Sequence, residues 1–184
     1  MIRIVKKSEL QTSRWTGGTT TELLIFPKSA TYKKMDFDFR ISTATIEVDK
    51  STFTSLKGVQ RTLMVLEGTL EIMHKNQHAI NLKPFQKDTF MGDWETISRG
   101  KAVDFNLMVR EPELSGDVQG LSIEQNGFAT LDAEKHGFIY FCEGDAVLNE
   151  KTKLSVGDSV YFDSLNPITI FAKSNIKLVH VSIQ

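Results

Sequence analysis

Polar residues that could bind a small ion or metabolite recur at two-residue intervals in three strand-forming stretches. They are Thr20 with Glu22, Arg40 with Ser42, and Asp104 with Asn106. In a β-strand, residues i and i+2 project from the same face, so each pair is expected on one face of its strand. If these faces line a cavity, the arginine would bind a carboxylate. The carboxylate and amide oxygens would accept hydrogen bonds from an amide or amine.

Two other arrangements would use the same residues differently. Single charged residues on a strand usually face solvent, although three independent pairs in one chain favour a shared cavity. A buried arginine also needs a carboxylate to neutralise it, so Arg40 could form a structural ion pair with Glu22 or Asp104. We favour the pocket and keep the ion pair as its alternative.

The elements that would position these pairs are organised around two similar hairpins. Residues 63–72 (LMVLEGTLEI) and 139–148 (IYFCEGDAVL) each run through aliphatic and aromatic residues to a Glu-Gly step, then continue in strand-forming residues. Glycine readily adopts the positive φ of a tight turn, so each stretch predicts a hairpin hinged at Gly68 or Gly144. Two such hairpins predict a duplicated domain.

The order of the remaining elements supports duplication and an all-β fold. A Gly-Asp step, at residues 92–93 and again at 157–158, and a closing apolar strand follow the hairpin in both halves. No segment shows sustained helical periodicity with caps, and strand-forming runs recur at the short spacing of a sandwich or small barrel. The polar stretch 110–120 contains proline and glycine, so we place the boundary there, with domains over residues 1–112 and 113–184.

Composition and charge exclude several classes of function. The chain has 184 residues and a formal net charge of -1, so it can bury a substantial core but offers no basic surface for nucleic acid or an anionic membrane. Its start lacks the apolar core of a signal peptide, and no apolar run approaches membrane-spanning length. The single cysteine, Cys142, excludes an internal disulfide. We expect a cytoplasmic protein.

Several short motifs occur in a distinctive order along the chain. They are Trp15-Thr16-Gly17-Gly18-Thr19-Thr20-Thr21-Glu22, Phe39-Arg40-Ile41-Ser42, Phe53 with Gly58 and Arg61, Leu66-Glu67-Gly68, Phe90-Met91-Gly92-Asp93 and Asp104-Phe105-Asn106-Leu107-Met108. In this order they resemble the HutD/Ves family of bicupins, which have two jelly-roll β-barrels of the cupin type. The resemblance implies two barrels packed as one unit, with a pocket in the first. The ligand-binding residues implied are Trp15, Thr20, Glu22, Arg40, Ser42, Arg61, Asp104 and Asn106.

The histidines do not follow the pattern of a metal-dependent cupin, which needs two neighbouring histidines on a strand, then a carboxylate and a third histidine. The chain has no His-x-His, and its histidines are His74, His78, His136 and His180. His74 and His78 can approach each other at i,i+4, but we expect solvated residues at the polar end of the hairpin. We therefore predict no metal and no cofactor.

One segment departs from the family pattern. Many members carry a longer, asparagine-containing run before the threonines, whereas Trp15 here is followed directly by Thr16 and two glycines. A ligand contact made by that asparagine cannot be transferred to this chain. We expect Trp15 to form a wall or lid of the pocket, and the glycines to let the backbone approach a ligand closely.

The resemblance implies a small-molecule-binding protein linked to histidine utilisation. Our first hypothesis is a non-enzymatic binding or regulatory protein whose first barrel holds a small acidic metabolite, such as formylglutamate. The second is a metal-independent isomerase or hydrolase that uses Glu22 or Asp104 as general base and Arg40 or Arg61 to stabilise an anion. The third is an interaction protein that presents a face of the second barrel. Monomer and homodimer are both left open.

Overall fold

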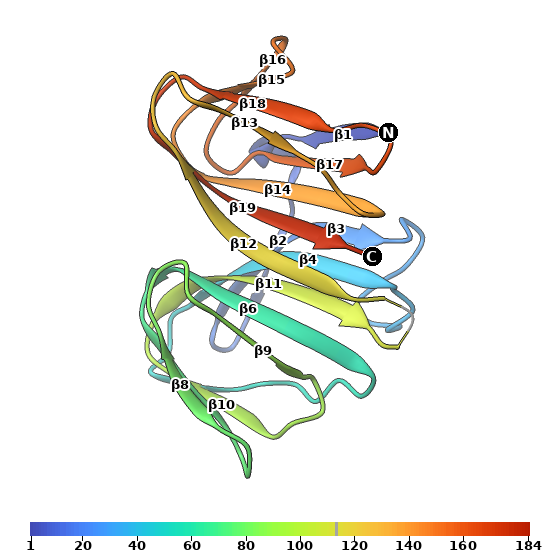
Figure 1. Ribbon diagram of the computed structural model, residues 1–184. Helices are drawn as coiled ribbons and strands as arrows, with labels where there is room; N and C mark the ends of the chain where they lie inside the picture. Colours follow the sequence, from blue (N-terminus) through green and yellow to red (C-terminus); the bar gives the residue numbers. More distant parts are fainter. Residues whose placement is uncertain (113) are drawn as a thin grey trace. The chain divides into compact units, whose positions relative to one another are not determined.

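The computed structural model describes residues 1–112 and 114–184, and its strands fall into two units. The larger unit is Gln11–Ser115, and the smaller unit combines Met1–Leu10 with Gly116–Gln184. Both are built from antiparallel strands (Figure 1), and the described residues contain one helical segment, the 3₁₀ turn Lys7–Glu9. The all-β prediction is confirmed. No helix in the described part of the chain is long and apolar enough to cross a membrane.

Two antiparallel sheets form the larger unit. The order of the six-stranded sheet is β2 (Thr12–Trp15), β3 (Gly18–Phe26), β4 (Phe39–Ile46), β11 (Ala102–Arg110), β6 (Val59–Gly68) and β9 (Lys87–Met91). The order of the four-stranded sheet is β5 (Lys50–Thr52), β10 (Thr96–Arg99), β7 (Leu70–His74) and β8 (Ala79–Leu82). One apolar cluster joins residues of both sheets, among them Leu63, Ile72 and Phe90. The unit is therefore a β-sandwich.

The smaller unit is also a pair of sheets. Its five-stranded sheet has the order β1 (Ile2–Val5), β17 (Ser159–Asp163), β14 (His136–Glu143), β19 (Ile176–Ile183) and β12 (Gly116–Ile123). Its four-stranded sheet has the order β13 (Phe128–Leu131), β18 (Ile168–Ala172), β15 (Ala146–Leu148) and β16 (Thr152–Leu154). Buried aromatic and aliphatic residues from both sheets, including Phe141, Phe162 and Ile170, fill its core.

The strand order repeats from one unit to the other, as the paired hairpins predict. The series β4-β11-β6-β9 of the larger unit corresponds to β12-β19-β14-β17 of the smaller, and β5-β10-β7-β8 corresponds to β13-β18-β15-β16. Eight strands in two sheets thus occur twice, which confirms the duplicated jelly roll. The larger unit adds β2 and β3 beside β4, and the smaller adds β1 beside β17.

The two hinge glycines occupy equivalent positions, and both have the positive φ expected of a glycine at a tight turn. Gly68 has φ 78° at the end of β6, and Gly144 has φ 77° just after β14. A Cβ on Gly68 would lie 2.4 Å from the carbonyl oxygen of Lys101, and one on Gly144 would lie 2.3 Å from that of Asn175. Left-handed backbone and close packing therefore both require glycine at these hinges.

The repeated Gly-Asp step is not structurally equivalent in the two halves. Gly92 follows β9, whereas Gly157 precedes β17, the strand that corresponds to β9. The residue that matches Gly157 is Phe85, which also has positive φ: 64° against 89° for the glycine. The expectation that the Gly-Asp step marks one repeated turn is therefore wrong, because a turn is defined by backbone conformation and not by residue type.

The first ten residues belong to the smaller unit and not to a domain over residues 1–112. β1 pairs with β17, with Ile2 opposite Phe162. Lys6 adds an ion pair to the buried carboxylate of Asp158 at 2.7 Å. The amide N–H of Lys7 also donates to Asp158, and such contacts lower the pKa of this carboxyl against the opposing effect of burial. The expected boundary lies between residues 112 and 113, and residue 113 is outside the described residues.

Candidate ligand-binding site

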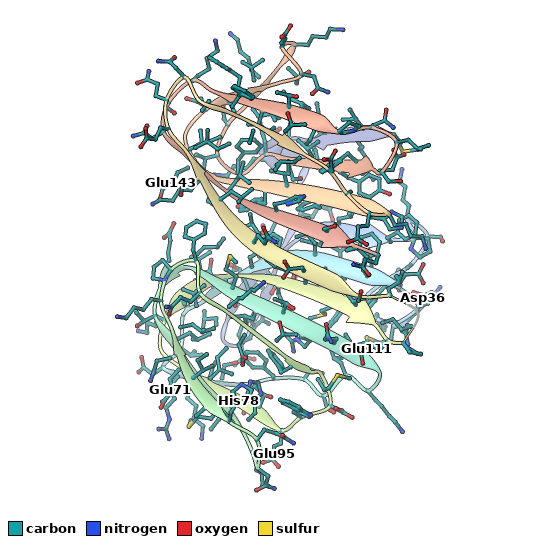
Figure 2. The ribbon with its side chains drawn as sticks, in the orientation of Figure 1. Asp36, Glu71, His78, Glu95, Glu111 and Glu143 are labelled. Atoms are coloured by element: carbon teal, nitrogen blue, oxygen red, sulfur yellow. The ribbon has the colours of Figure 1, made fainter. Side chains whose placement is uncertain are left out.

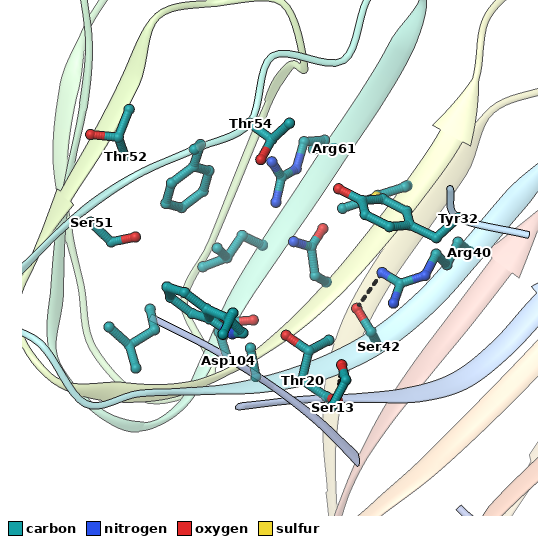
Figure 3. A pocket seen from close by; sticks show the side chains of 17 residues that line it. Ser13, Thr20, Tyr32, Arg40, Ser42, Ser51, Thr52, Thr54, Arg61 and Asp104 are labelled. Carbon is teal, nitrogen blue, oxygen red and sulfur yellow. Dashed lines mark hydrogen bonds between the residues drawn. The ribbon is translucent and has the colours of Figure 1, made fainter. Parts of the chain in front are cut away.

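A cavity of about 370 Å³ opens on the inner face of the six-stranded sheet in the larger unit (Figure 3). Its volume lies in the range of small-molecule sites. Seven of the eight predicted residues line it: Trp15, Thr20, Arg40, Ser42, Arg61, Asp104 and Asn106. Glu22 does not. Residues as far apart in the sequence as Trp15 and Asn106 thus meet at one place.

Strand register explains this meeting. Asn106 on β11 lies opposite Ser42 on β4, and Met108 lies between Arg40 on β4 and Arg61 on β6. Because side chains alternate between faces, Asp104 projects from the same face as Asn106. The three central strands therefore present their polar residues to one side of the sheet, as the two-residue spacing predicts.

Arg40 forms the ion pair that the sequence left as an alternative. Its Nε donates to a carboxylate oxygen of Glu22 at 2.8 Å, and its Nη1 donates to Ser42 Oγ at 3.2 Å. The guanidinium also lies 4.5 Å from the centre of the Tyr32 ring. Glu22 therefore neutralises Arg40 from outside the cavity, which explains why it is absent from the lining.

Arg61 is held mainly by aromatic rings. Its guanidinium carbon lies 4.8 Å from the ring centre of Phe53 and 5.5 Å from that of Phe90. Its Nε is buried and has no hydrogen-bond partner in the described part of the protein. Burial lowers its pKa to about 10, so the side chain remains a cation at neutral pH. Unlike Arg40, Arg61 has no ion pair among the described residues, although the charge of Asp104 acts on it through space.

Two buried oxygens complete the polar lining. Oδ1 of Asp104 and Oδ1 of Asn106 have no hydrogen-bond partner in the parts of the chain that the structure describes. Burial raises the pKa of Asp104 to about 7, although the positive charge of Arg61 opposes the shift. Near neutral pH, the Asp104 side chain therefore populates both its protonated and its ionised form.

The unpaired atoms define what a ligand must offer. Buried polar groups in proteins nearly always have partners, and leaving one unpaired costs about 1–3 kcal/mol. Arg61 Nε requires an acceptor, while the Asn106 oxygen and the ionised Asp104 require donors. A ligand that carries an anionic group and an N–H or O–H group has chemistry complementary to these three side chains.

Trp15 and Thr20 are the least buried of the predicted residues that line the pocket. The Trp15 side chain comes from β2 and is partly exposed, as expected for a wall or lid. A Cβ on Gly17 would lie 2.1 Å from the Trp15 ring. The glycine thus makes room for the tryptophan ring, whereas we expected it to admit a ligand to the backbone.

Some lining residues carry no sequence signal. Tyr32 belongs to a loop without periodicity, and Ser51, Thr52 and Thr54 belong to a short strand and the bend after it. Polar loop residues of this kind are ordinary surface residues in most sequences. Phe53 appears in the family motif, but its contact with Arg61 could not be predicted from spacing.

The histidines at the β7–β8 hairpin differ from the expectation of solvated residues. His74 is buried, and its Nε2 lies 2.9 Å from an oxygen of Asp88. His78 is exposed and contacts the same carboxylate at 3.0 Å. The expectation is therefore wrong for His74, because its side chain projects from β7 toward β9 and not into solvent.

Comparison with known proteins gives one family and several similar folds. A family model described as HutD matches residues 7–179. A conserved protein of unknown function from Pseudomonas aeruginosa, PA5104, is 21% identical with a TM-score of 0.84, over 100% of this chain and 99% of that chain. HutD from Pseudomonas fluorescens is also 21% identical, with a TM-score of 0.76 over the whole of both chains.

More distant structures share the fold. Oxalate decarboxylase from Bacillus subtilis is 5% identical and has a TM-score of 0.76, over 97% of this chain and 76% of that chain. No curated protein matches the sequence. Likenesses at this level of identity show the fold alone, and that fold is the two-barrel cupin architecture.

Proposed function

Because this chain belongs to the HutD family, we propose that it is a non-enzymatic binding or regulatory protein for a small acidic metabolite linked to histidine utilisation. The pocket of the larger unit would hold the ligand. The smaller unit would complete the bicupin without a site of the same kind. The cytoplasmic location and the assembly state stay predictions.

One observation carries the proposal. Three residues of the pocket lining each carry a buried polar atom that has no partner among the described residues: Arg61 Nε, Asp104 Oδ1 and Asn106 Oδ1. A stable protein rarely leaves three such atoms unpaired in one place unless water or a ligand contacts them. The cavity is large enough for a small metabolite.

The charges favour an anion. Arg40 is neutralised by Glu22, so the charges that remain in the pocket are Arg61 and Asp104. Since the pKa of Asp104 is about 7, the pocket is electropositive whenever that residue is protonated. A carboxylate next to Arg61 and an amide N–H next to Asn106 would fit this pattern, and formylglutamate offers both groups.

The proposal is tested by thermal shift with formylglutamate and other acids of histidine breakdown, against uncharged amides of the same size. We expect the acids to raise the melting temperature of the wild type and to lose that effect in Arg61→Gln. Arg99→Gln serves as the matched control, because Arg99 is exposed on β10 and outside the pocket. Equal shifts in both variants, or no shift in the wild type, would rule out an arginine-centred acid site.

The second candidate is a metal-independent isomerase or hydrolase that acts on a small carboxylate. The observation that favours it is the pKa of Asp104, about 7, which suits a general acid or base at neutral pH. Glu22, the other base considered, lies outside the pocket.

One incubation experiment distinguishes the binding protein from the enzyme. Any stabilising acid is kept with the protein for hours, and its NMR spectrum is followed. New product signals that disappear in Asp104→Asn would establish the enzyme. An unchanged spectrum for a ligand that binds would establish the binding protein.

A further inference from the structure

A second cluster of side chains able to bind a metal lies in the larger unit, and none of its residues lines the pocket. His74 ends β7, His78 follows in the turn before β8, and Asp88 lies on β9. The Asp88 carboxylate is 2.9 Å from Nε2 of His74 and 3.0 Å from Nε2 of His78. One nitrogen or oxygen atom from each residue lies within 4.8 Å of the other two.

The backbone of the hairpin places the two histidines together. The N–H of His74 donates to the carbonyl oxygen of His78 at 2.8 Å, and the N–H of Gln77 donates to that of His74 at 3.1 Å. These bonds close a tight turn, and the imidazole rings have centres 4.7 Å apart. Figure 2 shows His78 at the green hairpin, with Glu71 and Glu95 nearby in the view.

The contacts of His74 are compatible with the tautomer that a metal needs. Thr96 Oγ1 lies 3.1 Å from the carbonyl oxygen of Trp94, to which it can donate its single hydroxyl proton. When it does so, Thr96 Oγ1 accepts from His74 Nδ1, which lies 2.7 Å away. In a neutral ring this leaves a lone pair on Nε2, directed at the Asp88 carboxylate. Two acceptors at that distance need a proton or a metal ion between them.

We propose that His74, His78 and Asp88 bind one divalent transition-metal ion of the zinc type. Two imidazole nitrogens and one carboxylate oxygen are a common ligand set for zinc. Zinc–ligand distances of about 2.0–2.2 Å place tetrahedral ligand atoms about 3.3–3.6 Å apart. The contacts to Asp88 of 2.9 and 3.0 Å therefore need to lengthen by about half an ångström to admit the ion.

The surroundings of the cluster suit such an ion. The His78 side chain is 41% exposed, so its ring can rotate toward the metal and water can supply a fourth ligand. The bond from His74 to Thr96 is the outer-shell support that metal-bound histidines usually have. This inference revises the expectation of a chain without metal, and it concerns the hairpin and not the ligand pocket.

The ion would join the two sheets of the sandwich. β7 and the turn after it belong to the four-stranded sheet, whereas β9 is the edge strand of the six-stranded sheet. A metal bound across this edge would act as a structural cross-link, because it binds the folded unit and not the unfolded chain. Zinc should therefore raise the melting temperature of the protein.

Calorimetric titration of the tag-free 184-residue chain with Zn²⁺ tests the site. We expect one ion per wild-type chain, and an affinity at least about tenfold weaker in His78→Ala and in Asp88→Asn. His136→Gln and Asp93→Asn are the controls, since both residues lie outside the cluster, and their affinity should match the wild type. A wild type that binds no zinc, or variants that bind as tightly as it does, would overturn the proposal.

A second measurement guards against variants that fold poorly. His78 is exposed and its replacement leaves the core intact, so circular dichroism of His78→Ala should match the wild type. Zn²⁺ should raise the melting temperature of the wild type and of Asp93→Asn but not that of His78→Ala. An equal rise in all three would assign zinc binding to other residues and refute the cluster.

Discussion

Arg61 and Asp104 decide the chemistry of the pocket at the scale of single residues. They carry opposite charges and line one cavity, but no ion pair joins them among the described residues. Arg61 instead lies against Phe53 and Phe90, while the Asp104 side chain is buried. Each therefore retains a buried atom without a hydrogen-bond partner, which is unfavourable in the free protein.

Asp104 makes stability depend on pH with a definite sign. Its pKa is about 7 in the folded protein, against about 3.9 for an unfolded aspartate. The folded state thus holds the proton more tightly, and the resulting stability is full below about pH 4 and is lost as pH rises through 7. The loss would be on the order of a few kcal/mol if no other group compensated.

Urea unfolding at pH 5 and pH 8 measures this dependence. The wild type should lose stability between the two values, whereas Asp104→Asn should lose clearly less. Asp93→Asn, an exposed residue outside the pocket, should follow the wild type. If the Asp104 variant showed the same slope as the wild type, the pH dependence would come from other groups.

The hairpin is the element that the chain repeats. β6 and β14 each lead into a glycine with left-handed backbone. The next strand, β7 or β15, belongs to the four-stranded sheet of the same unit. The hinge thus turns the chain from one sheet of a sandwich to the other. Its residue type is set by φ and by the carbonyl packed against it, and not by function.

Replacing either hinge glycine should destabilise its own unit. Gly68→Ala or Gly144→Ala would place a side chain in left-handed backbone, which costs about 1–2 kcal/mol before the clash with a carbonyl oxygen is counted. Urea unfolding of each variant gives the loss. Gly58→Ala also has positive φ but meets no atom within 4 Å, so it should lose less. Equal losses at Gly58 and Gly68 would mean that the close carbonyl contact is unimportant.

At the scale of the whole molecule, the two copies of the jelly roll have diverged. Arg61 pairs with Phe90 on β9, and the same place in the smaller unit has Gly137 paired with Phe162. A Cβ on Gly137 would lie 2.4 Å from the Phe162 ring, so that ring occupies the space beside the glycine. One copy therefore keeps a polar cavity where the other packs an aromatic ring. This difference explains why the proposed ligand site lies in the larger unit.

The first strand, β1, joins the N-terminal residues to the last part of the chain. Deleting residues 1–5 would remove the pairing of β1 with β17 and leave that edge of β17 exposed. We expect amide hydrogen exchange to become faster in β14 and β17 of the smaller unit, with little change in β4 and β11. A control that replaces Ile2 alone by Ala should show a smaller effect. Faster exchange confined to the larger unit would contradict the assignment of β1.

The sequence by itself determined the local features of this protein. The absence of helical periodicity, the repeated Glu-Gly hinge and the two-residue spacing of the polar pairs depend on neighbouring residues, so they predicted the all-β duplicated fold. They also predicted which polar residues share a face: Arg40 with Ser42, and Asp104 with Asn106. Motif order was specific enough to indicate the family.

Only the tertiary structure decided which distant residues touch. It paired Glu22 with Arg40, added Tyr32 to the pocket, and placed β1 beside β17. It also brought Asp88 to two histidines that the hairpin pattern had assigned to solvent. Periodicity reports the face of a strand but not its partner, because the partner is chosen by packing between segments far apart in the chain. The ligand pocket and the proposed metal site both depend on such partners.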